Sequence, residues 1–148
     1  MIKTPYHTIC FVELPSTDLA ISRSFYSALF GWEIEEVPDL NYLLFTAKDG
    51  IRGGFRKVSH ISPDPGVIAC IAVEDINETL DRVESLGGTT LMPRTPLPDR
   101  SGFIADFMDP CGVICRLWSP WRAPVDVPSK SPIEEGERLL REVRPASP

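Results

Sequence analysis

Residues that commonly carry enzyme chemistry are scarce in this chain of 148 residues. It contains two histidines, His7 and His60, and four cysteines. An iron site built from two histidines and one carboxylate would need both histidines. His7 lies at the start of an expected strand and His60 in an expected linker. The sequence therefore predicts solvated or strand-edge histidines and no metal site of this kind.

The cysteines do not form a recognised metal-binding or redox motif. No two follow the Cys-x-x-Cys pattern, and Cys10, Cys70 and Cys115 lie within apolar, strand-like runs. Reduced thiols in the core are therefore expected at these three positions. Cys111 lies in an expected turn and is predicted to be exposed. No histidine adjacent in the sequence would activate it, so a nucleophilic role is not favoured.

A glycine pair flanked by arginines is a further candidate feature. Gly53 and Gly54 lie between Arg52 and Arg56 in an extended run. A phosphate-binding glycine loop is followed directly by a helix, and no helix signal follows here. The pair instead predicts a close backbone approach or a bulge. By strand alternation Arg52 and Arg56 share the face of Gly54; solvated strand-edge arginines are expected, with a cavity contact as the alternative.

Composition limits the classes of protein to which the chain can belong. With 43% hydrophobic residues, it can bury a core as one compact domain or two packed halves. A formal net charge of −6 argues against nucleic-acid binding, which needs a basic face. No apolar stretch approaches the ~18 residues that span a bilayer, and the N-terminus has no apolar signal core. A cytoplasmic location is expected.

The elements that must position these residues form two copies of one unit, 57 positions apart. Asp18 and Asp75 each follow an apolar run as helix N-caps, and Gly31 and Gly88 fall at the corresponding helix ends. Each copy is predicted to be β-α-β-β-β. The expected strands are 7–14, 32–37, 41–47 and 51–58 around a helix after Asp18, and 67–73, 89–92, 103–108 and 113–118 around a helix after Asp75.

This pattern predicts a single α+β domain over residues 1–118. It consists of two tandem modules, at about 7–58 and 67–118, joined by a linker over 59–66. Because ligand cavities form readily where duplicated units meet, residues between the copies are candidates for function. The proline-rich loop 93–102 is a candidate pocket rim or lid. Residues 119–148 are predicted to be a proline-rich extension with a short helix over 133–143.

Two motifs within this repeat carry a resemblance to a known family. The first is Phe25-Tyr26-Ser27-Ala28-Leu29-Phe30-Gly31-Trp32 after Asp18, and the second is Phe107-Met108-Asp109-Pro110-x-Gly112-x-x-x-Arg116-Leu117-Trp118. Together they resemble the vicinal-oxygen-chelate superfamily of glyoxalases, bleomycin-resistance proteins and extradiol dioxygenases, over about residues 7–118. The resemblance implies sheets that curl into a half-open barrel around a cavity, with modules paired within one chain or across a homodimer. It does not define the reaction.

The resemblance also implies where a metal would be bound in metal-using members. Each module gives one ligand seven positions before the capping Asp and a second four positions after the hairpin Gly. These positions hold Phe11, Gly54, Ile68 and Arg116 here. None of these side chains is an ordinary metal ligand, and a guanidinium would repel a cation. No metal site and no cofactor are therefore expected, unless the register is shifted by one or two residues.

Glu13 and Arg116 are the candidate catalytic residues, because the resemblance points both into the cavity. Buried charges are costly unless paired, so a Glu13–Arg116 ion pair is the simplest expectation. Such a pair either links strands in place of the metal, or Arg116 binds a ligand carboxylate or phosphate while Glu13 acts as a base or acceptor. The candidate ligand-binding residues are Phe11, Tyr42, Gly54, Phe55, Ile68, Cys70 and Trp118. The aromatic side chains among them are equally consistent with ordinary core.

Three functions remain open at this point. The favoured one is binding of a small organic ligand in the cavity without the usual metal site. The alternatives are a metal-free acid/base enzyme acting on an anionic substrate, and a metal-dependent lyase, isomerase or dioxygenase with shifted ligands. The expected partners are a small molecule and a second copy in a homodimer, with no nucleic acid and no membrane.

Overall fold

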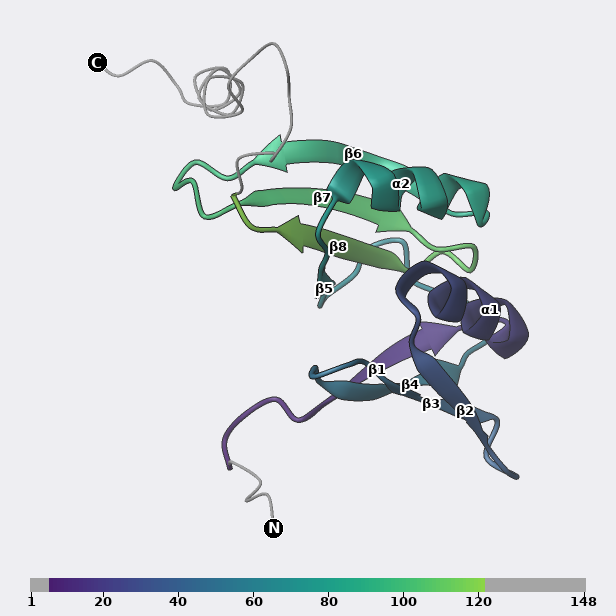
Figure 1. The fold of residues 1–148 in the computed structure, drawn as a ribbon. Helices are drawn as coiled ribbons and strands as arrows, with labels where there is room; N and C mark the ends of the chain where they lie inside the picture. The colour runs from purple at the N-terminus through teal and green to yellow at the C-terminus, as the bar shows by residue number, and fades with distance from the viewer. Residues whose placement is uncertain (1–5, 122–148) are drawn as a thin grey trace. The chain divides into compact units, whose positions relative to one another are not determined.

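A computed structural model describes residues 6–121, which form two units (Figure 1). The first unit extends to Val67 and includes Asp109–Val113, while the second comprises Ile68–Met108 and continues from Ile114. Each unit contains one helix and a four-stranded mixed sheet, which confirms the predicted α+β class and the two β-α-β-β-β modules. The helix predicted over 133–143 lies outside the described residues.

Unit 1 follows the predicted element order. Its elements are β1 (Phe11–Ser16), α1 (Leu19–Phe30), β2 (Glu33–Val37), β3 (Tyr42–Thr46) and β4 (Arg52–Lys57). The strand order is β1-β4-β3-β2, with β1 parallel to β4 and the other pairs antiparallel. The first strand begins at Phe11 and not at His7. His7 adopts a φ of 65°, outside the extended region, and the pairing with β4 begins only at Phe11, opposite Arg52.

The predicted signals at the ends of α1 are confirmed. The Asp18 side chain accepts a hydrogen bond from the backbone N–H of Ile21 at 3.2 Å. At the other end Gly31 has a φ of 69°, and its N–H donates to the carbonyl of Ser27. A residue without a side chain adopts this left-handed conformation at little cost, so the helix stops at the glycine.

One face of the unit 1 sheet packs against α1 and forms an aromatic core. Tyr26 of α1 stacks on Trp32 at a centroid distance of 5.4 Å and contacts Phe55 of β4 at 5.0 Å. Trp32 in turn stacks on Phe45 of β3 at 4.4 Å. Because every second strand residue faces the helix, this core leaves the alternate residues on the opposite face of the sheet.

Unit 2 repeats the arrangement with different end signals. Its elements are β5 (Ala69–Ala72), α2 (Ile76–Ser85), β6 (Thr89–Pro96), β7 (Phe103–Met108) and β8 (Ile114–Ser119), in the sheet order β5-β8-β7-β6. Asp75 caps α2 by accepting from the N–H of Glu78 at 3.0 Å. Gly87, with a φ of 94°, follows the helix end. α2 lies along one face of this sheet and contacts β6, β7 and β8 (Figure 1).

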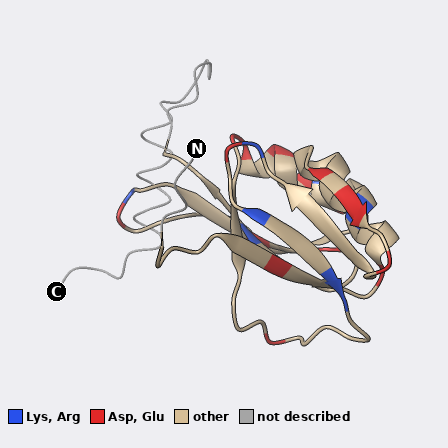
Figure 2. Cartoon of the chain, turned by 90° about the horizontal axis from the view of Figure 1, so that it is seen from below, with Lys and Arg blue, Asp and Glu red and all other residues tan. Residues whose placement is uncertain are grey.

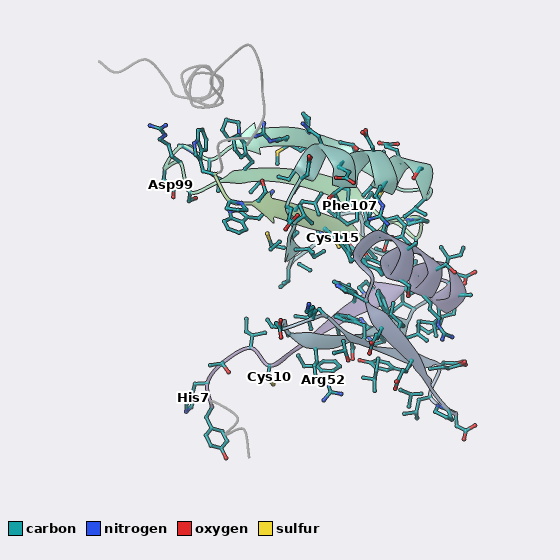
Figure 3. All side chains as sticks on the ribbon, viewed as in Figure 1. His7, Cys10, Arg52, Asp99, Phe107 and Cys115 are labelled. Atoms are coloured by element: carbon teal, nitrogen blue, oxygen red, sulfur yellow. The ribbon has the colours of Figure 1, made fainter. Side chains whose placement is uncertain are left out.

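The first part of the segment predicted as a long loop over 93–102 is strand. β6 continues to Pro96 at the edge of its sheet, with register shifts against β7 on either side of Met92. An edge strand with bulges tolerates prolines, because part of its backbone has no ladder partner. The remaining loop is short and closed by a hydrogen bond from Leu97 N–H to the Gly102 carbonyl, with Asp99 near its tip (Figure 3).

The hairpin between β7 and β8 belongs to unit 1, although the sequence repeat groups it with the second module. The Tyr26 hydroxyl donates to Asp109 Oδ2 at 2.9 Å. Asp109 Oδ1 accepts from the backbone N–H groups of Cys111 and Val113, each at 2.9 Å. The Asp109 residue is only 3% exposed, and burial raises the pKa of its carboxyl group. The two family motifs therefore meet at one buried hydrogen bond.

Two of the cysteines predicted to be buried are exposed. Cys115 is buried as expected, but Cys10 and Cys70 are exposed, and Cys111 is half-buried. Cys10 precedes β1 and so has no sheet neighbour, while Cys70 lies on the side of β5 away from α2.

No helix within residues 6–121 is both long and apolar enough to cross a bilayer. Acidic and basic residues are interspersed over the helices, strands and turns (Figure 2).

Candidate functional site

In unit 1 the candidate residues gather on the face of the sheet that α1 does not cover. Strand pairing places Glu13 of β1 beside Gly54 of β4, and Tyr42 of β3 beside Arg56. Phe11 pairs with Arg52 on the same side, and Arg52 points away from α1 in Figure 3. This face is called the open face of unit 1 below. It is defined by Phe11, Glu13, Tyr42, Arg52, Gly54 and Arg56.

A hydrogen-bonded network of three side chains occupies this open face. Glu13 accepts from the Tyr42 hydroxyl at 3.0 Å through Oε2, and from Arg56 Nε at 2.9 Å through Oε1. Tyr42 lies directly over Gly54, and a Cβ atom at position 54 would overlap its ring and hydroxyl. The close approach predicted for the glycine pair is thus confirmed. At position 53 a Cβ would likewise overlap Phe45 and the backbone of β1.

The network changes the acidity of its tyrosine. Burial of the hydroxyl, the hydrogen bond to Glu13 and the charge of that carboxylate together raise the pKa of Tyr42 to about 12, and Arg56 opposes them weakly. Tyr42 is therefore a neutral hydrogen-bond donor at physiological pH. The Glu13 carboxylate already accepts two hydrogen bonds, so the open face presents an organised set of polar groups beside the exposed ring of Phe11, which is 41% exposed.

Unit 2 carries a different pair on its corresponding face. Cys70 of β5, Arg116 of β8 and Asp106 of β7 lie side by side across three strands. Arg116 donates to Asp106 through Nε at 2.6 Å and through Nη2 at 2.8 Å, a two-bond fork. This hydrogen bonding raises the pKa of Arg116. Burial raises the pKa of the neighbouring Cys70 thiol, with Arg116 opposing, so Cys70 lacks the character of a reactive thiolate.

The expected Glu13–Arg116 ion pair is wrong, because each charge has a partner on a neighbouring strand. Glu13 pairs with Arg56, and Arg116 pairs with Asp106. The second pair had a usable sequence signal: a hairpin centred on residues 109–113 places Asp106 opposite Arg116 in an antiparallel register. The first pair depends on β1 lying parallel to β4, which joins distant segments and leaves no local signal.

The predicted ligand-binding residues divide between the open faces and the core. Phe55 was expected to line a pocket, but it is 0% exposed and packs in the aromatic core beside α1. Phe55 follows Gly54 directly on β4, so strand alternation places its side chain on the opposite face of the sheet, towards α1. Ile68 is exposed and precedes β5, and Trp118 is half-buried next to Gly102. The other four predicted residues lie on the open faces: Phe11, Tyr42 and Gly54 in unit 1, and Cys70 beside Arg116 in unit 2.

Two sheets of the same β-α-β-β-β connectivity, each covered on one side by its helix, define a paired-module α+β protein. Residues 8–117 match the family model for the Glyoxalase/Bleomycin resistance protein/Dioxygenase superfamily, and the chain belongs to this family.

Known relatives are similar to the chain at low sequence identity. The "Putative glyoxylase CFP32" of Mycobacterium bovis is 28% identical over 115 residues, which cover 73% of this chain and 44% of that protein. The chain thus spans less than half the length of this curated relative. Maize glyoxalase I is 25% identical, with a TM-score of 0.58, over 74% of this chain and 45% of that one.

A structure of a FosX fosfomycin resistance protein variant from Listeria monocytogenes has the same fold. It is 16% identical, with a TM-score of 0.65, and the match covers 77% of this chain and 90% of that one. That protein is complexed with Mn(II) and 1S,2S-dihydroxypropylphosphonic acid.

The residues of this chain do not fit such a metal. At the four implied ligand positions, Phe11 and Ile68 have no donor atom, Gly54 has no side chain, and Arg116 is a cation. The strand partner of Gly54 is Glu13, whose carboxylate is engaged by Tyr42 and Arg56. Within residues 6–121, no cluster of three or more His, Cys, Asp or Glu side chains has the arrangement of a metal site.

Proposed function

We propose that this protein binds a small organic ligand on the open face of unit 1 without using a metal ion. The observation that carries the proposal is the network of Tyr42, Glu13 and Arg56 that lies over Gly54, where metal-using relatives would place a ligand. A neutral hydroxyl, a carboxylate and a guanidinium are held together beside an exposed aromatic ring. Such a set recognises a ligand by hydrogen bonds and stacking.

The chemistry of this face limits the ligand class. Phe11 offers a ring for a flat apolar body, and Arg56 offers a cation for a polar or anionic group. Arg116 is an unsuitable second anchor, because two of its donors are already committed to Asp106. We further propose that the protein acts in the cytoplasm and forms a homodimer. The cytoplasmic location is supported by the four free cysteines, as expected in a reducing compartment. The homodimer is supported by the module pairing that the family implies.

A thermal-shift screen followed by calorimetry tests the proposal. The screen covers small carboxylates, thiol conjugates, aromatic diols and cationic antibiotics, because a ligand that binds only the folded state raises the melting temperature. Each hit is then titrated against the Phe11→Ala variant and an Ile21→Ala control. Ile21 is 44% exposed, close to the value for Phe11, but lies on α1 and not on the sheet.

The expected result is an affinity roughly 5- to 150-fold weaker for Phe11→Ala, because a stacking ring is worth about 1–3 kcal/mol to a flat ligand. The Ile21→Ala control should bind as the unaltered protein does. Equal affinity of both variants would contradict the assigned face, and a screen without any hit would contradict ligand binding. Elemental analysis of the purified protein tests the second half of the proposal, since a stoichiometric transition metal would overturn it.

A further inference from the structure

A groove at the end of β4 is formed by unit 1 alone and adjoins the open face, with which it shares Arg56. Its volume is about 550 Å³, within the range of roughly 300–1,000 Å³ typical of small-molecule sites. The residues that line it come from the ends of β1 and β4 and from the following linker. They are Pro15, Arg56, Lys57, Val58, Ser59, His60, Ile61 and Ser62.

The charge of this lining is opposite in sign to that of the whole chain. Arg56, Lys57 and His60 are basic side chains, and no lining residue is acidic, although the chain carries a net charge of −6. A concave surface with charges of one sign concentrates its field and attracts ions of the opposite sign. The groove is therefore suited to a small anion.

The basic side chains are held in place and keep hydrogen-bond donors. Lys57 Nζ donates to the Thr17 carbonyl, and an ammonium group has two further donors. Arg56 contacts Glu13 through Nε, and its guanidinium carries further N–H donors on the terminal nitrogens. The Val58 N–H also donates to the Ser16 carbonyl at 2.9 Å, so the lining segment is joined to the end of β1.

The hydroxyl groups of the groove are also fixed by local contacts. Ser59 Oγ lies 3.2 Å from His60 Nδ1, and Ser62 Oγ accepts from the Asp64 N–H and donates to the Asp64 carbonyl, each at 3.3 Å. Pro15, Val58 and Ile61 add apolar walls. A lining that combines basic donors from Arg56 and Lys57 with apolar residues suits an oxyanion that carries a short hydrocarbon part.

We propose that this groove is a binding site for a small oxyanion of the carboxylate or phosphate type. The Lys57 ammonium and the terminal N–H groups of Arg56 provide the donors for this anion. The two proposed sites share Arg56 but differ in Lys57, which lines the groove and is not part of the network around Tyr42.

The test is an NMR titration of the ¹⁵N-labelled full chain with two probes, inorganic phosphate and butyrate. Each is compared with sodium chloride at equal ionic strength, which accounts for general screening. The proposal predicts saturable amide shifts at residues 57–62 for at least one probe. Saturation by phosphate alone identifies a phosphate-type site, and saturation by butyrate alone identifies a carboxylate-type site.

Three variants assign the effect to the groove. Lys57→Met is expected to weaken binding about tenfold, the loss of one charge-assisted hydrogen bond. Lys57→Arg keeps the charge and should retain binding, which separates charge from packing if the methionine variant is less stable. Lys48→Met removes an equal charge from the β3–β4 turn and should have no effect. The proposal is overturned if neither probe saturates, or if Lys57→Met and Lys48→Met weaken binding equally.

Discussion

Replacing Tyr26 by phenylalanine removes one hydroxyl group and keeps the aromatic ring. The ring remains stacked against Trp32 and Phe55, so the aromatic core of unit 1 is preserved. What is lost is the hydrogen bond to Asp109 Oδ2, an oxygen of a carboxyl group that is 3% exposed. The variant thus isolates a single buried interaction between the two motifs that identify the family.

The expected loss is about 1.5–3 kcal/mol of unfolding free energy. Hydrogen bonds to charged groups contribute about this much, and the oxygen of Asp109 is left buried without its donor. With a urea m-value of about 1–3 kcal/mol/M, the unfolding midpoint should fall by roughly 1 M. Urea titrations followed by circular dichroism and by tryptophan fluorescence measure the shift, and agreement of the two signals shows whether unfolding is two-state.

The size of the loss should depend on pH. Burial raises the pKa of Asp109, and the Tyr26 hydrogen bond is among the contacts that lower it. Tyr26→Phe therefore raises the folded-state pKa further. A carboxyl group with a raised folded pKa favours the folded state most at pH values below its unfolded pKa, and this contribution is lost as the pH rises through the folded pKa. The variant should accordingly lose more stability at about pH 7 than at about pH 3.

A double-mutant cycle with Asp109→Asn decides whether the hydrogen bond is responsible. The amide keeps the shape of the side chain but carries no charge, so the loss from Tyr26→Phe should be at least about 1 kcal/mol smaller in that background. A loss below about 0.5 kcal/mol in the unaltered protein, or an equal loss in both backgrounds, would refute the reasoning.

Three further predictions concern the open faces and one helix cap. Glu13→Gln should lower the pKa of Tyr42 from about 12 towards 10 in a tyrosinate absorbance titration referenced to Tyr42→Phe, because it removes the carboxylate charge; an unchanged pKa would contradict the network. The combined Arg116→Met and Asp106→Leu replacement should be less destabilising in urea than either single change, since each single change leaves one charge unpaired; additive losses would contradict this. Asp75→Ala should cost about 1 kcal/mol of stability by removing the cap of α2, and a loss near zero would show that the cap hydrogen bond contributes nothing.

The helices and turns could be predicted from the sequence because their signals are local. Asp18 and Asp75 cap their helices, and Gly31 ends α1, as the residue types indicate. The start of β1 could not be predicted, because it depends on where the pairing with β4 begins, and nothing in the alternating pattern marks Phe11 as that position. The extent of β6 was missed because a local signal was misleading. Its prolines suggested a loop, but an edge strand accommodates them.

The candidate site was less predictable, since its contacts join segments that are distant in the sequence. Alternation correctly placed Arg56 on the face of Gly54, but not beside Glu13, because that neighbour follows from the parallel pairing of β1 and β4. The same limit applies to Tyr42, which reaches Glu13 from β3. Residue patterns indicate which face a side chain occupies, whereas its partner on that face depends on strand order.

The paired strands of the two units correspond, although their spacing in the sequence differs. Glu13 lies beside Gly54, and Cys70, 57 positions after Glu13, lies beside Arg116, which is 62 positions after Gly54 (116 − 54). The register is maintained by the faces that pack against the helices, where a shift of one residue would expose the core. The open faces are free of this constraint, so equivalent positions carry a tyrosine-carboxylate-arginine network in one unit and an arginine-carboxylate fork in the other. A shared fold therefore permits two different chemistries at the same register, and the chemistry of each face has to be tested separately.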